Sequence, residues 1–126
     1  MKMIRALVVG MLLMGNVFAQ EEAVLDATNL DALRAKAGVE VTVEGMVTEI
    51  GTTKESTITF INIGLPKKQG FVALIYQKDY PAFPEGFTKY ANQKVRVKGL
   101  MKLYKGETPQ IVVSSPDNIT LVTPPQ

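Results

Sequence analysis

Residues 39–64 read VEVTVEGMVTEIGTTKESTITFINIG and predict two β-strands joined by a short turn. Val39, Val41 and Val43 alternate with polar residues, which is the period of two expected for a strand with one buried face. Residues 57–63 supply the β-branched and aromatic side chains of a second strand, and the intervening GTTKES is rich in turn-forming residues. The rest of the chain is placed by reference to this pair of strands.

Gly45 interrupts the first strand. A glycine weakens strand pairing unless the chain bends or bulges there, and a curved sheet needs such a bend to let one strand serve two parts of it. We therefore expect a bend at Gly45, with the strand continuing over residues 46–50. Gly99 is expected to be a second bend, in a later strand over residues 94–101 where valines alternate with basic residues.

The other elements follow from apolar runs, alternation and capping signals. Further strand segments are predicted over residues 71–76, 110–114 and 119–122. A short helix is predicted over residues 30–37, with Thr28 or Asn29 as its cap and Gly38 as its stop. The residues before it, 20–26, are expected to form a mobile lead-in.

The segment after residue 76 contains two prolines and therefore does not read as a strand. Pro84 is well placed as the first residue of one or two helical turns, and Asn92 can adopt the left-handed conformation that ends them. Phe83, Phe87 and Tyr90 are expected to plug one end of the folded sheet.

The composition excludes several kinds of chemistry. The chain has 126 residues and contains no cysteine, histidine or tryptophan, so it has no cysteine zinc site, no disulfide and no nucleophile activated by histidine. The carboxylates Asp79, Glu85 and Asp117 fall in predicted turns or at a helix start, where capping and solvation account for them. We expect a single domain with no catalytic residues, no metal and no cofactor.

Residues 1–19 have the pattern of a secretory signal peptide. A basic start precedes an apolar run over residues 6–14 and a small-x-small cleavage signal, VFA, at residues 17–19. The apolar run is short for a membrane span, although an uncleaved anchor helix is the alternative. The mature protein would begin near Gln20, be secreted or periplasmic, and have no transmembrane anchor. The predicted divisions are the signal peptide 1–19, a lead-in and short helix 20–38, the β domain 39–122 and a tail 123–126.

The predicted order is strand, strand, strand, helix, strand, strand. With the motifs GVEVTVEGMVTEI, TITFINIG, KVRVKGLMKLYKG and PQIVVSSPDNI, residues 38–122 resemble the oligonucleotide/oligosaccharide-binding fold (OB-fold). The resemblance is to small secreted bacterial OB-fold domains and to the nucleic-acid-binding group that includes anticodon-binding domains. It implies an all-β, five-stranded Greek-key barrel with a short helix between strands 3 and 4, to which this chain adds a short N-terminal helix.

The resemblance also implies where a ligand binds. In this fold the usual surface is the outer face of the second and third strands, flanked by two loops. If Ile61 and Ile63 point inward, Phe60 and Asn62 point outward, where Phe60 stacks on a base or sugar and Asn62 bonds its edge. A register shifted by one residue would instead bury Phe60.

Two tyrosines extend this surface. Alternation puts Tyr76 and Phe71 on opposite faces of the third strand, and Tyr76 is the better contact because its hydroxyl tolerates water. Tyr104 stands between two lysines in the loop after the fourth strand, which suits a phosphate backbone and a stacked base; alternatively, it braces the hairpin. The candidate ligand-binding residues are Phe60, Asn62, Tyr76, Tyr104, Lys54, Lys67, Lys68, Lys102 and Lys105.

The net charge of the predicted mature chain counts against a polyanionic ligand. The chain has fourteen basic and twelve acidic residues, and loss of the signal peptide removes two basic ones and leaves no net charge. The basic row Lys94, Arg96 and Lys98 is expected to face Glu40 and Glu44 across the sheet, because the first and fourth strands are neighbours in this fold.

The predicted function is a non-catalytic secreted OB-fold binding module. Its ligand is expected to be single-stranded nucleic acid or another anionic oligomer. The alternative is an envelope or stress-related interaction protein that binds a protein or an oligosaccharide through the same face. Salt dependence separates the two, because phosphate contacts weaken steeply as salt rises.

Overall fold

The computed structural model describes residues 23–66 and 69–123. The predicted signal peptide over residues 1–19, together with Lys67 and Lys68, lies outside them. The described part of the chain is predominantly β, with eight strands in one sheet and few helices. Within those two ranges, no helix has the length and apolar character needed to cross a membrane.

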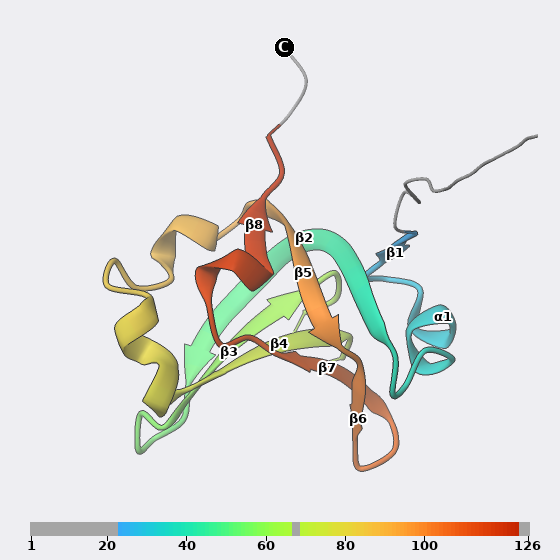
Figure 1. Ribbon diagram of the computed structural model, residues 1–126, viewed down its shortest axis with the longest axis horizontal. Coiled ribbons are helices and arrows are strands. Elements are labelled where there is room, and N and C mark those ends of the chain that lie inside the picture. The colour runs from blue at the N-terminus through green and yellow to red at the C-terminus, as the bar shows by residue number, and fades with distance from the viewer. Residues whose placement is uncertain (1–22, 67–68, 124–126) are drawn as a thin grey trace, which may run out of the picture.

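The elements match most of the predicted segments (Figure 1). The strands are β1 (Val24–Asp26), β2 (Glu40–Thr52), β3 (Ile58–Ile63), β4 (Phe71–Tyr76), β5 (Lys94–Leu100), β6 (Lys102–Tyr104), β7 (Thr108–Val112) and β8 (Ile119–Leu121). The helical elements are α1 (Leu30–Arg34) and the 3₁₀ segments η2 (Gln77–Ala82), η3 (Thr88–Tyr90) and η4 (Pro116–Asn118). Hydrogen bonding follows the order β6-β7-β4-β3-β2-β5-β8, with β1 beside β2.

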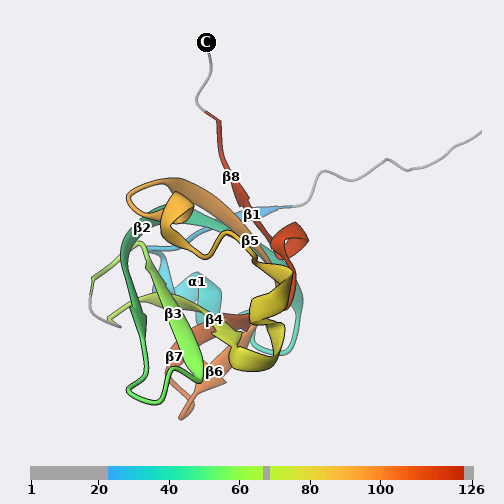
Figure 2. The same cartoon turned by 90° about the vertical axis from the view of Figure 1, so that its left-hand side faces the viewer.

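The long strand β2 changes partner along its length. It pairs with β5 up to Met46 and with β3 from Val47 onward, and the register with β3 shifts between Val47 and Glu49. A bulge of this kind bends a strand and increases its twist, and Figure 1 shows β2 as an arch over β3 and β4. The strands therefore surround a common interior, as Figure 2 shows from the side.

The predicted all-β class is confirmed, whereas a closed barrel of five strands is not. The pairing gives eight strands in an open sheet that runs from β6 to β8. Only Met101 separates β5 from β6, so the chain itself joins these two parts of the sheet. Val39, expected on the buried face, precedes β2 and is 48% exposed.

Gly45 permits close packing, and the partner exchange of β2 lies just beyond it. A Cβ atom at Gly45 would come within 2.7 Å of the Ala27 Cβ and 2.9 Å of a methyl group of Ile63. Ala27 is fully buried, and its N–H donates to the Glu44 carbonyl at 2.9 Å. The expected lead-in therefore contains a strand, β1, which Ala27 fixes against β2.

We expect Gly45→Ala to lower the free energy of unfolding by about 1–3 kcal/mol, the usual cost of overpacking a filled core. Gly51→Ala is the matched control, because a Cβ there meets nothing within 4 Å. Urea unfolding of both variants and of the unmodified protein measures the difference. Equal stability of the two variants would contradict the close packing of Ala27 against Gly45.

The two ends of the curled sheet are covered by helical segments (Figures 1 and 2). α1 lies at one end, and η2 and η3 lie at the other. α1 begins where the Asn29 side chain accepts a hydrogen bond from the Ala32 N–H at 3.2 Å, as predicted for a cap. It is shorter than the predicted 30–37, and the chain turns through Gly38 with a φ of 85°.

The helix predicted to begin at Pro84 is not present. Pro84 lies in a turn between η2 and η3, and Gly86, two residues later, has a φ of 76°, a left-handed conformation that a right-handed helix does not contain. Asn92 does adopt the predicted left-handed conformation, with a φ of 61°. Short 3₁₀ segments thus replace the regular helix.

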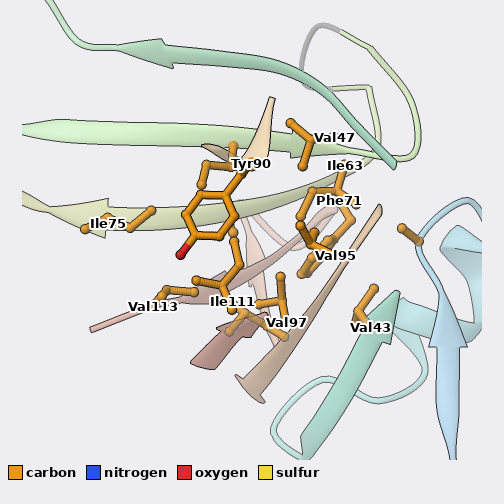
Figure 3. Packing of buried hydrophobic residues seen from close by; sticks show 14 of the residues in the cluster. Val43, Val47, Ile63, Phe71, Ile75, Tyr90, Val95, Val97, Ile111 and Val113 are labelled. Atoms are coloured by element: carbon orange, nitrogen blue, oxygen red, sulfur yellow. The ribbon is translucent and has the colours of Figure 1, made fainter. Parts of the chain in front are cut away.

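Aromatic residues of this segment close the end of the sheet, as predicted. Phe83 and Tyr90 are buried, and the ring centroids of Phe83 and Phe87 are 5.0 Å apart. Figure 3 shows the Tyr90 ring among core side chains of β4 and β7, with Ile111 and Val113 close to it.

Candidate ligand-binding face

The register of β3 places Phe60 on the outer face of the sheet. Ile61 and Ile63 are fully buried in the core, and Phe60 alternates with them. A slip of one residue would move both isoleucines to the surface, so core burial fixes the register. Phe60 lies opposite Gly51 on β2 and opposite Leu74 on β4.

Three aromatic side chains from three strands line one groove on this face. Phe60 comes from β3, Tyr76 from the end of β4 and Tyr104 from the end of β6. The groove has a volume of about 390 Å³. Its remaining lining residues are Ile58, Val72, Leu74, Thr108 and Gln110.

The floor of this groove is apolar. Val72 and Leu74 are 2% and 5% exposed, yet they lie outside the core cluster because they alternate with the inward residues of β4. Above them Tyr76 and Tyr104 are 36% and 53% exposed. An apolar floor flanked by accessible aromatic rings suits a flat ring of a ligand.

A second cavity, the polar cavity, adjoins the groove at Phe60, and most of its lining residues have polar or charged side chains. It has a volume of about 550 Å³. Its lining residues are Glu49, Gly51, Thr52, Thr53, Lys54, Glu55, Phe60 and Asn62. Asn62 is only 4% exposed, and its partner across the strands is Glu49. Phe60 therefore separates an apolar subsite from a polar one.

The hairpin that carries Tyr104 is held by its backbone and by α1. Lys105 and Gly106 have φ angles of 53° and 75°, the two consecutive positive values of a tight hairpin turn, and the Glu107 N–H donates to the Tyr104 carbonyl at 3.0 Å. The Arg34 Nε of α1 donates to the Glu107 carbonyl at 2.8 Å. These bonds fix the hairpin without using the Tyr104 ring, which argues against the bracing role.

Three of the candidate lysines lie in the described residues, one lining the polar cavity and two on or beside the strand that carries Tyr104. Lys54 lines the polar cavity, and the Lys105 Nζ lies 5.4 Å from the centre of the Tyr104 ring. Lys102 is exposed on β6, opposite Gln110. The described residues thus place three of the five predicted lysines around the face.

Two of the three cations of the basic row on β5, Lys94 and Arg96, pair with Glu44 as predicted. Glu44 lies opposite Arg96, whose Nε is 2.7 Å from its carboxylate, and the Lys94 Nζ is 3.5 Å away on the other oxygen. The hydrogen bond from Arg96 lowers the pKa of Glu44 from its usual value. The prediction for Glu40 was wrong, because it lies opposite Leu100 and not opposite a cation.

Sequence reasoning missed Glu49, Gly51, Val72, Leu74 and Gln110 as lining residues. Strict alternation from the valines of β2 puts residue 49 on the inner face, and the register shift after Val47 returns it to the outer one. The apolar residues of β4 were read only as a buried strand. Their pairing with Phe60 and Asn62 is visible once the register is known.

Comparison with known proteins bears on the fold. No family model matches the chain, and no curated protein matches it. Among solved structures, the OBody AM1L10, in a structure bound to hen egg-white lysozyme, is similar with a TM-score of 0.54 and 15% identity, over 88% of this chain and 100% of the OBody.

Two synthetases are also similar in structure. Aspartyl-tRNA synthetase from Entamoeba histolytica gives a TM-score of 0.51 with 18% identity over 79% of this chain. A putative aspartyl-tRNA synthetase from Leishmania major Friedlin gives 0.54 with 12% identity over 82%. In each case the match covers 21% of the synthetase. At these identities the likeness shows the fold alone, which is OB-like.

Proposed function

We propose that this protein is a non-catalytic OB-fold module that binds single-stranded nucleic acid, or another extended anionic oligomer, across the outer face of β3 and β4. The observation that carries the proposal is the groove shared by Phe60, Tyr76 and Tyr104. Base stacking on aromatic rings beside lysines is the general mode by which single strands are held.

The cations near the groove support an anionic ligand. Lys105 lies over Tyr104, Lys102 is on the same hairpin, and Lys54 lies beyond Phe60. A phosphate backbone that follows these lysines would place successive bases over the rings between them. The synthetases of similar fold are named for work on a tRNA, which agrees with this ligand class.

We also propose a secreted or periplasmic location, which rests on the sequence of residues 1–19. The absence of histidine and cysteine from the whole sequence supports a binding role without catalysis.

Binding of a protein or an oligosaccharide through the same face is the second candidate. The apolar floor of the groove and the zero net charge of the predicted mature chain favour it. The OBody of similar fold is in a structure bound to a protein, lysozyme.

Titration of a labelled single-stranded oligonucleotide at several salt concentrations tests the first candidate. Each phosphate contact with a single strand contributes about −0.7 to the slope of log affinity against log salt, so contacts by Lys54, Lys102 and Lys105 predict a slope of about −2. Lys105→Ala should reduce the slope by about 0.7. Lys94→Ala is the matched control, because Lys94 is paired with Glu44 and should leave the slope unchanged.

The two candidates give different results. Saturable binding that weakens with salt supports nucleic acid. An absence of binding at low salt would end that proposal. Screening with oligosaccharides and envelope proteins would then test the second candidate, for which affinity is expected to change little with salt.

A further inference from the structure

The polar cavity beside Phe60 exists because residue 51 has no side chain. Gly51 lies directly opposite Phe60 on the neighbouring strand, and a Cβ built there meets nothing within 4 Å. Directly opposite residues on one face are normally about 5 Å apart at Cβ and pack together. Here the space beside the Phe60 ring is left open, and the loop carrying Lys54 walls it.

The chemistry of the cavity walls suits a group that donates hydrogen bonds. Among the described residues that line it, Glu49 and Glu55 contribute two carboxylates and Lys54 contributes one cation. An ionised carboxylate only accepts hydrogen bonds, so Glu49 and Glu55 disfavour a phosphate, whose contact on this side of Phe60 is left to Lys54. The two carboxylates favour the N–H groups on the edge of a nucleobase.

The positions of two residue pairs across β2 and β3 fit a stacked base. Gly51 pairs with Phe60, and Glu49 pairs with Asn62. The second pair lies on the same face, about 7 Å further along the strands. A ring that lies over Gly51 against Phe60 would therefore direct its edge toward Glu49 and Asn62. The carboxylate of Glu49 is placed to read that edge.

We propose that this cavity is a base-selective subsite for a nucleobase that carries an amino group, with the Glu49 carboxylate accepting its N–H donors. Guanine presents two adjacent donors, N1–H and the 2-amino group, and cytosine and adenine each present one amino group. Thymine and uracil have no amino group. The subsite rests on the proposed function, since it assumes a single-stranded nucleic acid across Phe60.

The test compares short single-stranded oligonucleotides in a thymine background, one all thymine and others with one central guanine, cytosine or adenine. We expect the guanine oligonucleotide to bind about ten-fold more tightly than the all-thymine one. In Glu49→Gln this preference should fall to near one, while binding of the all-thymine strand is kept. The amide of glutamine replaces one acceptor by a donor at the same position and size.

A second variant fills the cavity directly. Gly51→Val places a β-branched side chain at a strand position with open space, so the fold should be kept, as circular dichroism and urea unfolding will show. We expect it to weaken the guanine oligonucleotide about ten-fold or more by removing one stacking position. Gly51→Ala should have an intermediate effect.

The outcomes separate the subsite from the proposed function. Equal affinity for all oligonucleotides, unchanged in Glu49→Gln and Gly51→Val, would overturn the subsite while the nucleic-acid proposal stands. A preference that survives Glu49→Gln would overturn the role of Glu49. No binding of any oligonucleotide would overturn both.

Discussion

Tyr90→Ala is expected to reduce the free energy of unfolding by about 3–5 kcal/mol, the range for deleting a large aromatic side chain from a core. Tyr90 is 1% exposed and is among the largest buried side chains. It belongs to the same core cluster as Ile75 of β4 and Ile111 of β7 (Figure 3). Since a domain of this size is stable by only about 5–15 kcal/mol, urea unfolding should show a large fall in the midpoint.

The control is Tyr90→Phe, which keeps the ring and should cost less than about 1.5 kcal/mol. Burial, with a smaller contribution from Glu85, raises the pKa of the Tyr90 phenol above its usual 10.0. The folded state therefore holds this proton more tightly than the unfolded state. The resulting stabilisation is full below pH 10.0 and is lost as pH rises through the folded-state pKa. Tyr90→Phe should not show this loss of stability at high pH. If Tyr90→Ala were as stable as Tyr90→Phe, the role of the Tyr90 ring in filling the end of the sheet would be contradicted.

The strands were predictable because their patterns are local. The segment 71–76 matches β4 at both ends, and the buried isoleucines of β3 set its face. β1 and β6 were not predictable in this way. Each has three residues, too few to show an alternating pattern; β1 is ordered by parallel pairing with β2, and β6 by a hairpin with β7. The β6–β7 hairpin was read as a turn because Gly106 and Pro109 dominate its sequence.

The residues of the candidate site were predictable where they follow from alternation along a strand. They were missed where they depend on strand register and strand pairing. Phe60 and Tyr76 face outward as expected from the period of two. Phe60 and Tyr76 share a groove with Tyr104 because β4 pairs with β7 and β7 pairs with β6. The pairing of β4 with β7 is not specified by any local sequence pattern. The role of each residue in binding stays a prediction, and it is tested most directly by removing rings from the groove.

The double variant Phe60→Ala, Tyr104→Ala is expected to weaken binding of a single-stranded oligonucleotide by at least about 30-fold. Stacking of a base on an aromatic side chain contributes about 1–3 kcal/mol, and two rings therefore contribute about 2 kcal/mol or more. Each single variant should lose part of this affinity. Fluorescence anisotropy at low salt measures the affinity of all three variants. Over a series of salt concentrations, the slope of log affinity against log salt should stay near that of the unmodified protein, because no lysine is changed.

Tyr104→Phe is the matched control, because it keeps the ring and removes only the hydroxyl. Neither Phe60 nor Tyr104 belongs to the core cluster, so the double variant should fold, which circular dichroism checks. If it binds as well as the unmodified protein, the oligonucleotide does not use the groove. Salt-sensitive binding that persists without the rings would instead assign the contact to lysines alone, and the polar cavity beside Phe60 would then have no stacked base to read.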